Sequence, residues 1–163
     1  MRNFLRVTML WILLAFLGEV VLAPLIAIKG ISPDFSVIAL VLLGLSQGAG
    51  PATVAGFAMG LVQDLSNPTL LGLHALCKTC LGFGIGSLRQ RLVFGLPIVE
   101  GALVTLAALS HDFLFLLVQS RLTDETFLRP LLTQSLPVAI YTGLAGVVIL
   151  RLADLFGFLR QEE

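Results

Sequence analysis

Five titratable side chains lie inside or at the ends of apolar stretches, where a charge within a membrane is costly unless it is paired: Glu19, Asp64, His74, Lys78 and Glu100. Asp64 ends one stretch and His74 begins the next, so the two are expected to hydrogen-bond across a short loop. Glu19 has no obvious partner. Structural pairing is the favoured interpretation of the group, and contact with a partner protein is one alternative. A proton or ion path is the other, although only histidine titrates near neutral pH when unperturbed.

Residue spacing suggests a partner for the buried lysine. Lys78 lies eight residues before Gly86, and Glu100 lies eight residues after Leu92, so two neighbouring helices would hold them at similar depths. We therefore predict a Lys78–Glu100 ion pair.

Three motifs have the outline of a catalytic or cofactor site. Cys77 and Cys80 have CxxC spacing, but a structural zinc site needs four ligands and both cysteines lie inside one apolar stretch. The glycines of 82–86 resemble a dinucleotide loop, but no strand precedes them. His111-Asp112 is interpreted as an interfacial cap, because no serine occupies a nucleophile setting. We expect no metal, no cofactor and no enzyme activity.

The composition shows where these residues must sit. The chain has 163 residues, of which 57% are apolar and 12% charged, against about 25% charged in an average soluble domain. Segments 7–18, 35–63 and 130–150 carry no charge. The protein is therefore expected to cross a membrane several times. Its net charge of zero offers no basic surface to nucleic acid.

Six helices of about 20 residues fit this length and leave room only for short loops. The predicted fold is an all-α membrane bundle of about six transmembrane helices in a single domain, 1–163. Two stretches are short and are interpreted as tilted spans, with a re-entrant hairpin as the alternative. Pro97 and Pro137 are expected to kink their helices. The approximate spans are 7–28, 35–46, 51–64, 70–88, 92–118 and 131–150.

The basic residues predict the orientation, because Lys and Arg are retained on the cytoplasmic side. With six spans and an inside N-terminus, the inner side receives six arginines: Arg2, Arg6, Arg89, Arg91, Arg151 and Arg160. The outer side receives three basic residues: Lys29, Arg121 and Arg129. Both termini are therefore expected in the cytoplasm.

Small residues form two stripes at helical spacing. One stripe consists of Ala52, Gly56, Gly60 and Asp64, and the other of His74, Lys78, Gly82 and Gly86. Small residues let two membrane helices approach closely. Packing within the bundle is the favoured interpretation, and a homodimer face or a partner face is the alternative.

The middle of the chain carries a recognisable pattern. Pro33-Asp34-Phe35 leads into the apolar run 37–43, and GAGP at 48–51 and LGLHAL at 71–76 follow. This pattern resembles that of the MreD family of rod-shape-determining proteins, and length and hydropathy extend the likeness over essentially the whole chain. The matching residues are Pro33, Asp34, Gly56, Phe57, Gly60, Asp64, Gly72 and His74.

The resemblance implies a non-enzymatic inner-membrane scaffold of the bacterial cell-elongation machinery, which helps organise peptidoglycan synthesis and maintain cell shape. Its implied partners are the bitopic protein MreC, MreB filaments, RodA and a class-B penicillin-binding protein. The implied fold is similar to the S-components of energy-coupling-factor transporters. We expect the second to fourth helices to offer a groove to the MreC membrane helix. The alternative function is a small-solute binding or transport subunit, with Glu19, Lys78 and Glu100 as the polar groups of its pocket.

Overall fold

The computed structural model describes residues 2–65, 70–89, 96–123 and 126–155. This part of the chain is helical apart from turns and one isolated β-bridge between Ile28 and Ile31. Several residues considered above lie outside it: part of the loop between Asp64 and His74, Arg91, Leu92 and Arg160. The side chains of Arg2 and Arg6 are likewise not described.

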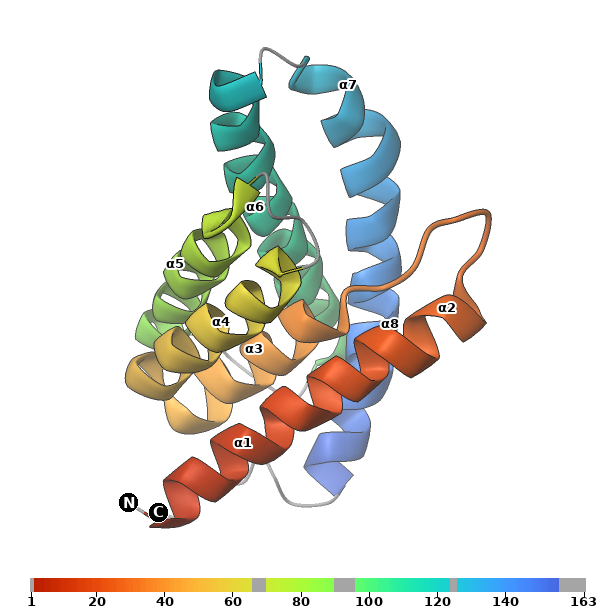
Figure 1. The fold of residues 1–163 in the computed structure, drawn as a ribbon. Coiled ribbons are helices and arrows are strands. Elements are labelled where there is room, and N and C mark those ends of the chain that lie inside the picture. Colours follow the sequence, from red (N-terminus) through yellow and green to blue (C-terminus); the bar gives the residue numbers. More distant parts are fainter. Residues whose placement is uncertain (1, 66–69, 90–95, 124–125, 156–163) are drawn as a thin grey trace.

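The described helices form six rods (Figure 1). The first is continuous through α1 (Arg2–Leu17), the π-helical turn η1 (Gly18–Leu22) and α2 (Ala23–Ile26). The next four are α3 (Phe35–Gln47), α4 (Ala49–Asp64), α5 (Leu73–Leu88) and α6 (Pro97–Thr123). The last joins α7 (Leu128–Pro130), η4 (Leu131–Ser135) and α8 (Leu136–Leu155). The sequence predicts six helices, and the described residues form six rods.

Three of the described helices are long and apolar enough to cross a membrane: Thr8–Ile26, Pro97–Leu122 and Leu128–Leu155. In contrast, α3 has 13 residues, which makes it about 20 Å long against a hydrocarbon core of about 30 Å. It is buried along almost its whole length, and Val37, Leu40 and Val41 are fully inaccessible. The central helix therefore begins inside the bundle rather than at its surface.

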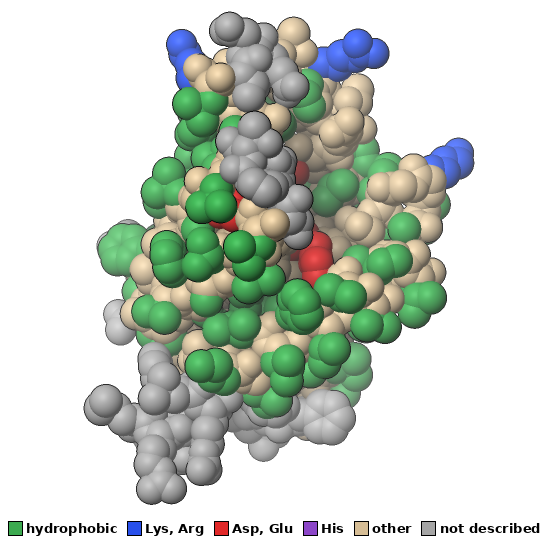
Figure 2. Space-filling view, viewed as in Figure 1, with side chains coloured by type: hydrophobic (Ala, Val, Ile, Leu, Met, Phe, Trp, Pro, Cys, Tyr) green, Lys and Arg blue, Asp and Glu red, His purple; other side chains and the backbone are tan. Residues whose placement is uncertain are grey.

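The short helices form one layer of the bundle. In Figure 1, α3, α4 and α5 run side by side, α1 crosses them, and α6 and α8 stand more upright behind. The first turn of α1 and the last turn of α8 lie at the same end of the molecule. Figure 2 shows a face that is largely hydrophobic, with Lys and Arg at its edges and Asp and Glu only in recesses between helices. This distribution fits a protein surrounded by lipid.

Pro97 does not act as the sequence predicts. Pro97 is the first residue of α6, where its missing N–H is not needed, so it begins the helix and does not kink it. Pro137 lies two residues after η4, and Pro24 lies two residues after η1. Because proline removes a backbone donor and crowds the preceding turn, a widened π turn just before it accommodates the defect.

Candidate functional site

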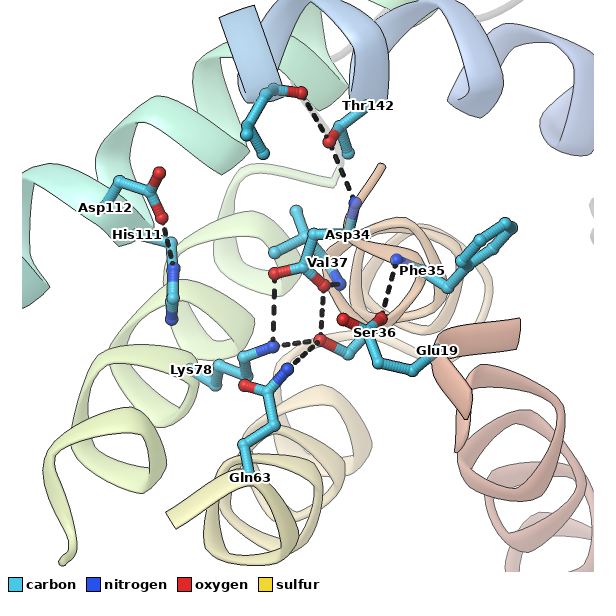
Figure 3. A network of polar contacts seen from close by, with 11 residues as sticks. Glu19, Asp34, Phe35, Ser36, Val37, Gln63, Lys78, His111, Asp112 and Thr142 are labelled. Carbon is cyan, nitrogen blue, oxygen red and sulfur yellow. Dashed lines mark hydrogen bonds and ion pairs between the residues drawn. The ribbon is translucent and has the colours of Figure 1, made fainter. Parts of the chain in front are cut away.

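A polar network surrounds the N-terminus of the buried helix α3 (Figure 3). Asp34 is the N-cap residue, and its Oδ1 accepts the Val37 backbone N–H at 2.9 Å and the Ser36 hydroxyl. The Asp34 backbone N–H donates at 3.0 Å to Thr142 Oγ1 on α8. Aspartate is among the preferred N-cap residues, so the same carboxylate that starts the helix also collects donors from around it.

Lys78 of α5 supplies the positive charge of the network. Its side chain is fully buried, and Nζ lies 3.4 Å from Asp34 Oδ2 and donates to Ser36 Oγ. Gln63 Nε2 of α4 donates to the same hydroxyl at 3.4 Å. Ser36 therefore connects three helices, and Lys78 is compensated by both a carboxylate and a hydroxyl.

Glu19 supplies the second carboxylate and extends the network to the first helix. It lies in the π turn η1, and its Oε2 accepts the Phe35 backbone N–H at 3.1 Å. The sequence offered no partner for Glu19, because a backbone donor at a helix N-terminus cannot be identified from side-chain types. With Glu19 included, five of the six rods contribute a group to the network.

The predicted Lys78–Glu100 pair is wrong. Lys78 pairs with Asp34, and Glu100 Oε2 lies 3.3 Å from Arg151 Nε on α8. Depth counting fixes only the position along the membrane normal, whereas pairing also requires two side chains to face each other. The predicted spans 7–28 and 35–46 leave Asp34 in the loop between them, but the shortness of α3 brings it into the interior.

Asp64 and His74 are adjacent, as expected, but the bond is not between their side chains. The Asp64 carboxylate accepts the backbone N–H groups of Gly72, His74 and Ala75, each at 3.0 Å. It thereby caps the free donors at the start of α5. The His74 ring instead stacks on Phe115 of α6, with the centroids 4.2 Å apart.

The two small-residue stripes face each other between α4 and α5. A Cβ added at Gly56 would lie 2.3 Å from the Lys78 carbonyl oxygen, and one at Gly60 would lie 2.4 Å from Ala75 Cα. Towards the other end, a Cβ at Gly82 would lie 2.3 Å from the Ala52 carbonyl oxygen. Backbones this close leave no room for a side chain, so the stripes serve packing within the bundle. Gly82 and Gly86 contribute to this contact, whereas Gly84 faces open space.

The amino-acid sequence was also compared with models of known protein families. The family described as rod shape-determining protein MreD matches residues 1–158.

The chain belongs to the MreD family.

The MreD family comprises membrane proteins with a role in rod-shape determination, and it is not known as an enzyme family. Comparison with curated proteins and with solved structures returned no match.

The residues of the MreD-family pattern occupy different kinds of position. Asp34 belongs to the polar network, and Pro33 beside it is fully buried. Gly72 has φ +96°, a left-handed conformation that favours glycine, and it precedes α5. Phe57 is 53% exposed on the outer face of α4. Phe57 is thus the one bulky member of the pattern that is available to lipid or to a partner.

The remaining motifs of this MreD-family protein make no hydrogen bond to the network within the described part of the chain, although Figure 3 shows His111 and Asp112 beside it. His111 Nδ1 is 3.0 Å from Asp112 Oδ1, and both residues lie inside α6 rather than at a helix end. Cys77 is buried and Cys80 is exposed. Among the described residues, no group of three or more His, Cys, Asp and Glu side chains could hold a metal ion.

Sequence reasoning missed Ser36, Gln63 and Thr142 as members of the network. One signal for Ser36 was available, since Asp34 with a serine two residues later is a typical helix start at which side chains hydrogen-bond locally. Thr142 is one of few polar residues in the charge-free segment 130–150. Its role depends on the packing of α8 against the start of α3, which spacing along the chain does not determine.

Proposed function

We propose that this MreD-family protein is a membrane scaffold of the bacterial cell-elongation machinery. It binds the transmembrane helix of MreC and holds MreC in an assembly with MreB, RodA and a class-B penicillin-binding protein. In this way it helps organise lateral peptidoglycan synthesis. The observation that carries the proposal is the family match over residues 1–158.

The distribution of polar groups supports a scaffold rather than a catalyst. The ammonium of Lys78 and the carboxylates of Asp34 and Asp64 are directed at other helices of the same chain. The exposed faces are apolar, so association with a partner would depend on close packing and a few hydrogen bonds within the bilayer. We further propose a single multi-pass domain in the inner membrane, with both termini in the cytoplasm. The start of α1 and the end of α8 lie at one end of the bundle, which supports both termini on the same side of the membrane, and the cytoplasmic side is proposed from the basic residues alone.

A small-solute binding subunit, similar to the S-components, is the second candidate. A cleft of about 380 Å³ beside Glu19 favours it, since this volume is in the range of small-molecule sites. However, neither Lys78 nor Glu100 lines the cleft. Two of the three polar groups expected for a solute pocket, Lys78 and Glu100, therefore form ion pairs away from the cleft.

Depletion in a rod-shaped host tests the scaffold proposal. We expect depleted cells to lose their rod shape, and MreC to co-purify with the tagged protein from membranes of undepleted cells. Cells that stay rod-shaped after depletion would contradict the role, and absence of MreC from the purified material would contradict the mechanism.

A further inference from the structure

The cleft between α1 and α4 joins an apolar groove to the polar network. Its outer walls include Leu13 and Phe16 of α1 and Val62 of α4, all substantially exposed. Three polar side chains, of Glu19, Ser36 and Gln63, also line it and are buried or half-buried. A membrane-facing cleft therefore leads from lipid to carboxylate and amide oxygens.

The polar end of the cleft has unused acceptor capacity. The network contains the carboxylates of Glu19 and Asp34 but one ammonium, that of Lys78, which lies against Asp34. The bond described for the Glu19 carboxylate comes from a backbone N–H rather than from a cation. Gln63 Oε1 is buried and has no hydrogen-bond partner among the described residues. An unpaired acceptor in a low-dielectric interior is destabilising, so the cleft favours an occupant that brings a donor, and best a positive charge.

The depth of Glu19 in the membrane indicates which kind of molecule could occupy the cleft. Glu19 lies seven residues before Ile26, the end of α2, which corresponds to about 10 Å along the helix. A lipid headgroup stays near the membrane surface, and an acyl chain has no donor. A side chain on a membrane-spanning helix can be held at this depth and can pair there.

We propose that the α1–α4 cleft receives a transmembrane helix of a partner protein that carries a lysine, arginine or other strong hydrogen-bond donor near its middle. This inference rests on the proposed scaffold function. It places the seat of the partner helix between the first and third helices, α1 and α4, rather than on the second to fourth helices expected from the sequence. The donor would bind the Glu19 carboxylate and the Gln63 carbonyl oxygen, and the apolar side chains of the partner would pack on Leu13 and Val62. Binding of this kind depends on the side chains lining the cleft and leaves the α4–α5 contact intact.

Site-specific photocrosslinking in membranes tests the seat, with full-length MreC as the probe. We expect p-benzoylphenylalanine in place of Leu13 or Val62 to crosslink MreC. The same residue in place of Leu144, which is 66% exposed on α8, should not. Glu19→Gln should lower the crosslinked fraction about tenfold or more, because a charge-assisted bond is lost. Glu100→Gln, which removes a buried carboxylate away from the cleft, is the matched control and should leave crosslinking unchanged.

The outcomes separate the seat from the function. Crosslinking from Leu144 alone, with MreC still co-purifying, would overturn the seat but leave the scaffold in place. The proposed position of the partner helix would also be overturned if Leu13 and Val62 crosslinked only to lipid. It would be overturned as well if Glu19→Gln kept its thermal stability and did not alter the crosslinking of MreC. Failure of MreC to co-purify at all would overturn the proposed function itself.

Discussion

The Asp34–Lys78 pair allows a quantitative test of the network. Lys78→Met removes the ammonium and leaves Asp34 uncompensated in the interior, and breaking a buried pair in this way costs about 3–5 kcal/mol of stability. Asp34→Asn removes the carboxylate and leaves the fully buried Lys78 ammonium without its partner, which should lower the free energy of unfolding by a similar amount. Asparagine caps helices as well as aspartate does, so this substitution keeps the cap of α3 and isolates the effect of the charge.

The double variant should be much more stable than the sum of the two losses. Asp34→Asn with Lys78→Met removes both charges of the pair together, so neither is left without its partner, and the main loss is the bond from Lys78 to Ser36. We expect it to lose about 1–3 kcal/mol, since replacing a buried pair as a whole is far less costly than breaking it. The interaction energy of the cycle is then several kcal/mol.

Steric trapping in bicelles measures reversible unfolding and gives the free energy of unfolding for each variant. The control cycle combines Lys78→Met with Glu100→Gln, which are not in contact, and it should be additive within about 0.5 kcal/mol. Additivity in the Asp34 cycle, or coupling in the Glu100 cycle instead, would refute the assignment of the pair.

Three further predictions concern the helix contacts and can be checked by thermal unfolding in detergent. Gly56→Ala should destabilise by about 1–3 kcal/mol, because its Cβ meets backbone, whereas Gly84→Ala, with nothing within 4 Å, should be neutral or stabilising by up to about 1 kcal/mol; equal melting points for the two variants would argue against the close α4–α5 contact. Asp64→Ala should cost at least about 2 kcal/mol by freeing three backbone donors, and Asp64→Asn should restore part of it; an unchanged melting point for Asp64→Ala would contradict the cap. Gly72→Ala should cost about 1–2 kcal/mol because of its positive φ, and a stabilised variant would contradict that conformation.

The contact between α4 and α5 could be predicted from the sequence because it depends on local spacing. Residues four apart share a helix face, and a short loop makes consecutive helices antiparallel neighbours. The stripe that ends in Asp64 and the one that begins at His74 therefore had to meet near the loop. The helical class and the six rods followed in the same way from apolar stretches and breaks.

The partner of Lys78 could not be predicted, because it depends on how far a short helix penetrates the bundle. The apolar stretch 35–46 was known to be short, but its burial on all sides was not. Only that burial takes Asp34 from the surface to the interior. The pairing of Glu100 could not be predicted for a related reason, since it depends on which faces of α6 and α8 meet.

The double variant Asp34→Asn with Lys78→Met, expressed in a rod-shaped host depleted of the native protein, tests the central claim most directly. If the buried charges serve only to stabilise the scaffold, the shape of the cells should depend on the stability of the protein and not on the charges themselves. Cells with the double variant at normal membrane levels should then remain rods, whereas either single variant should yield rounded cells and lower protein levels. Rounded cells with a stable, abundant double variant would contradict the account, because the charges would then be needed for chemistry rather than for the fold.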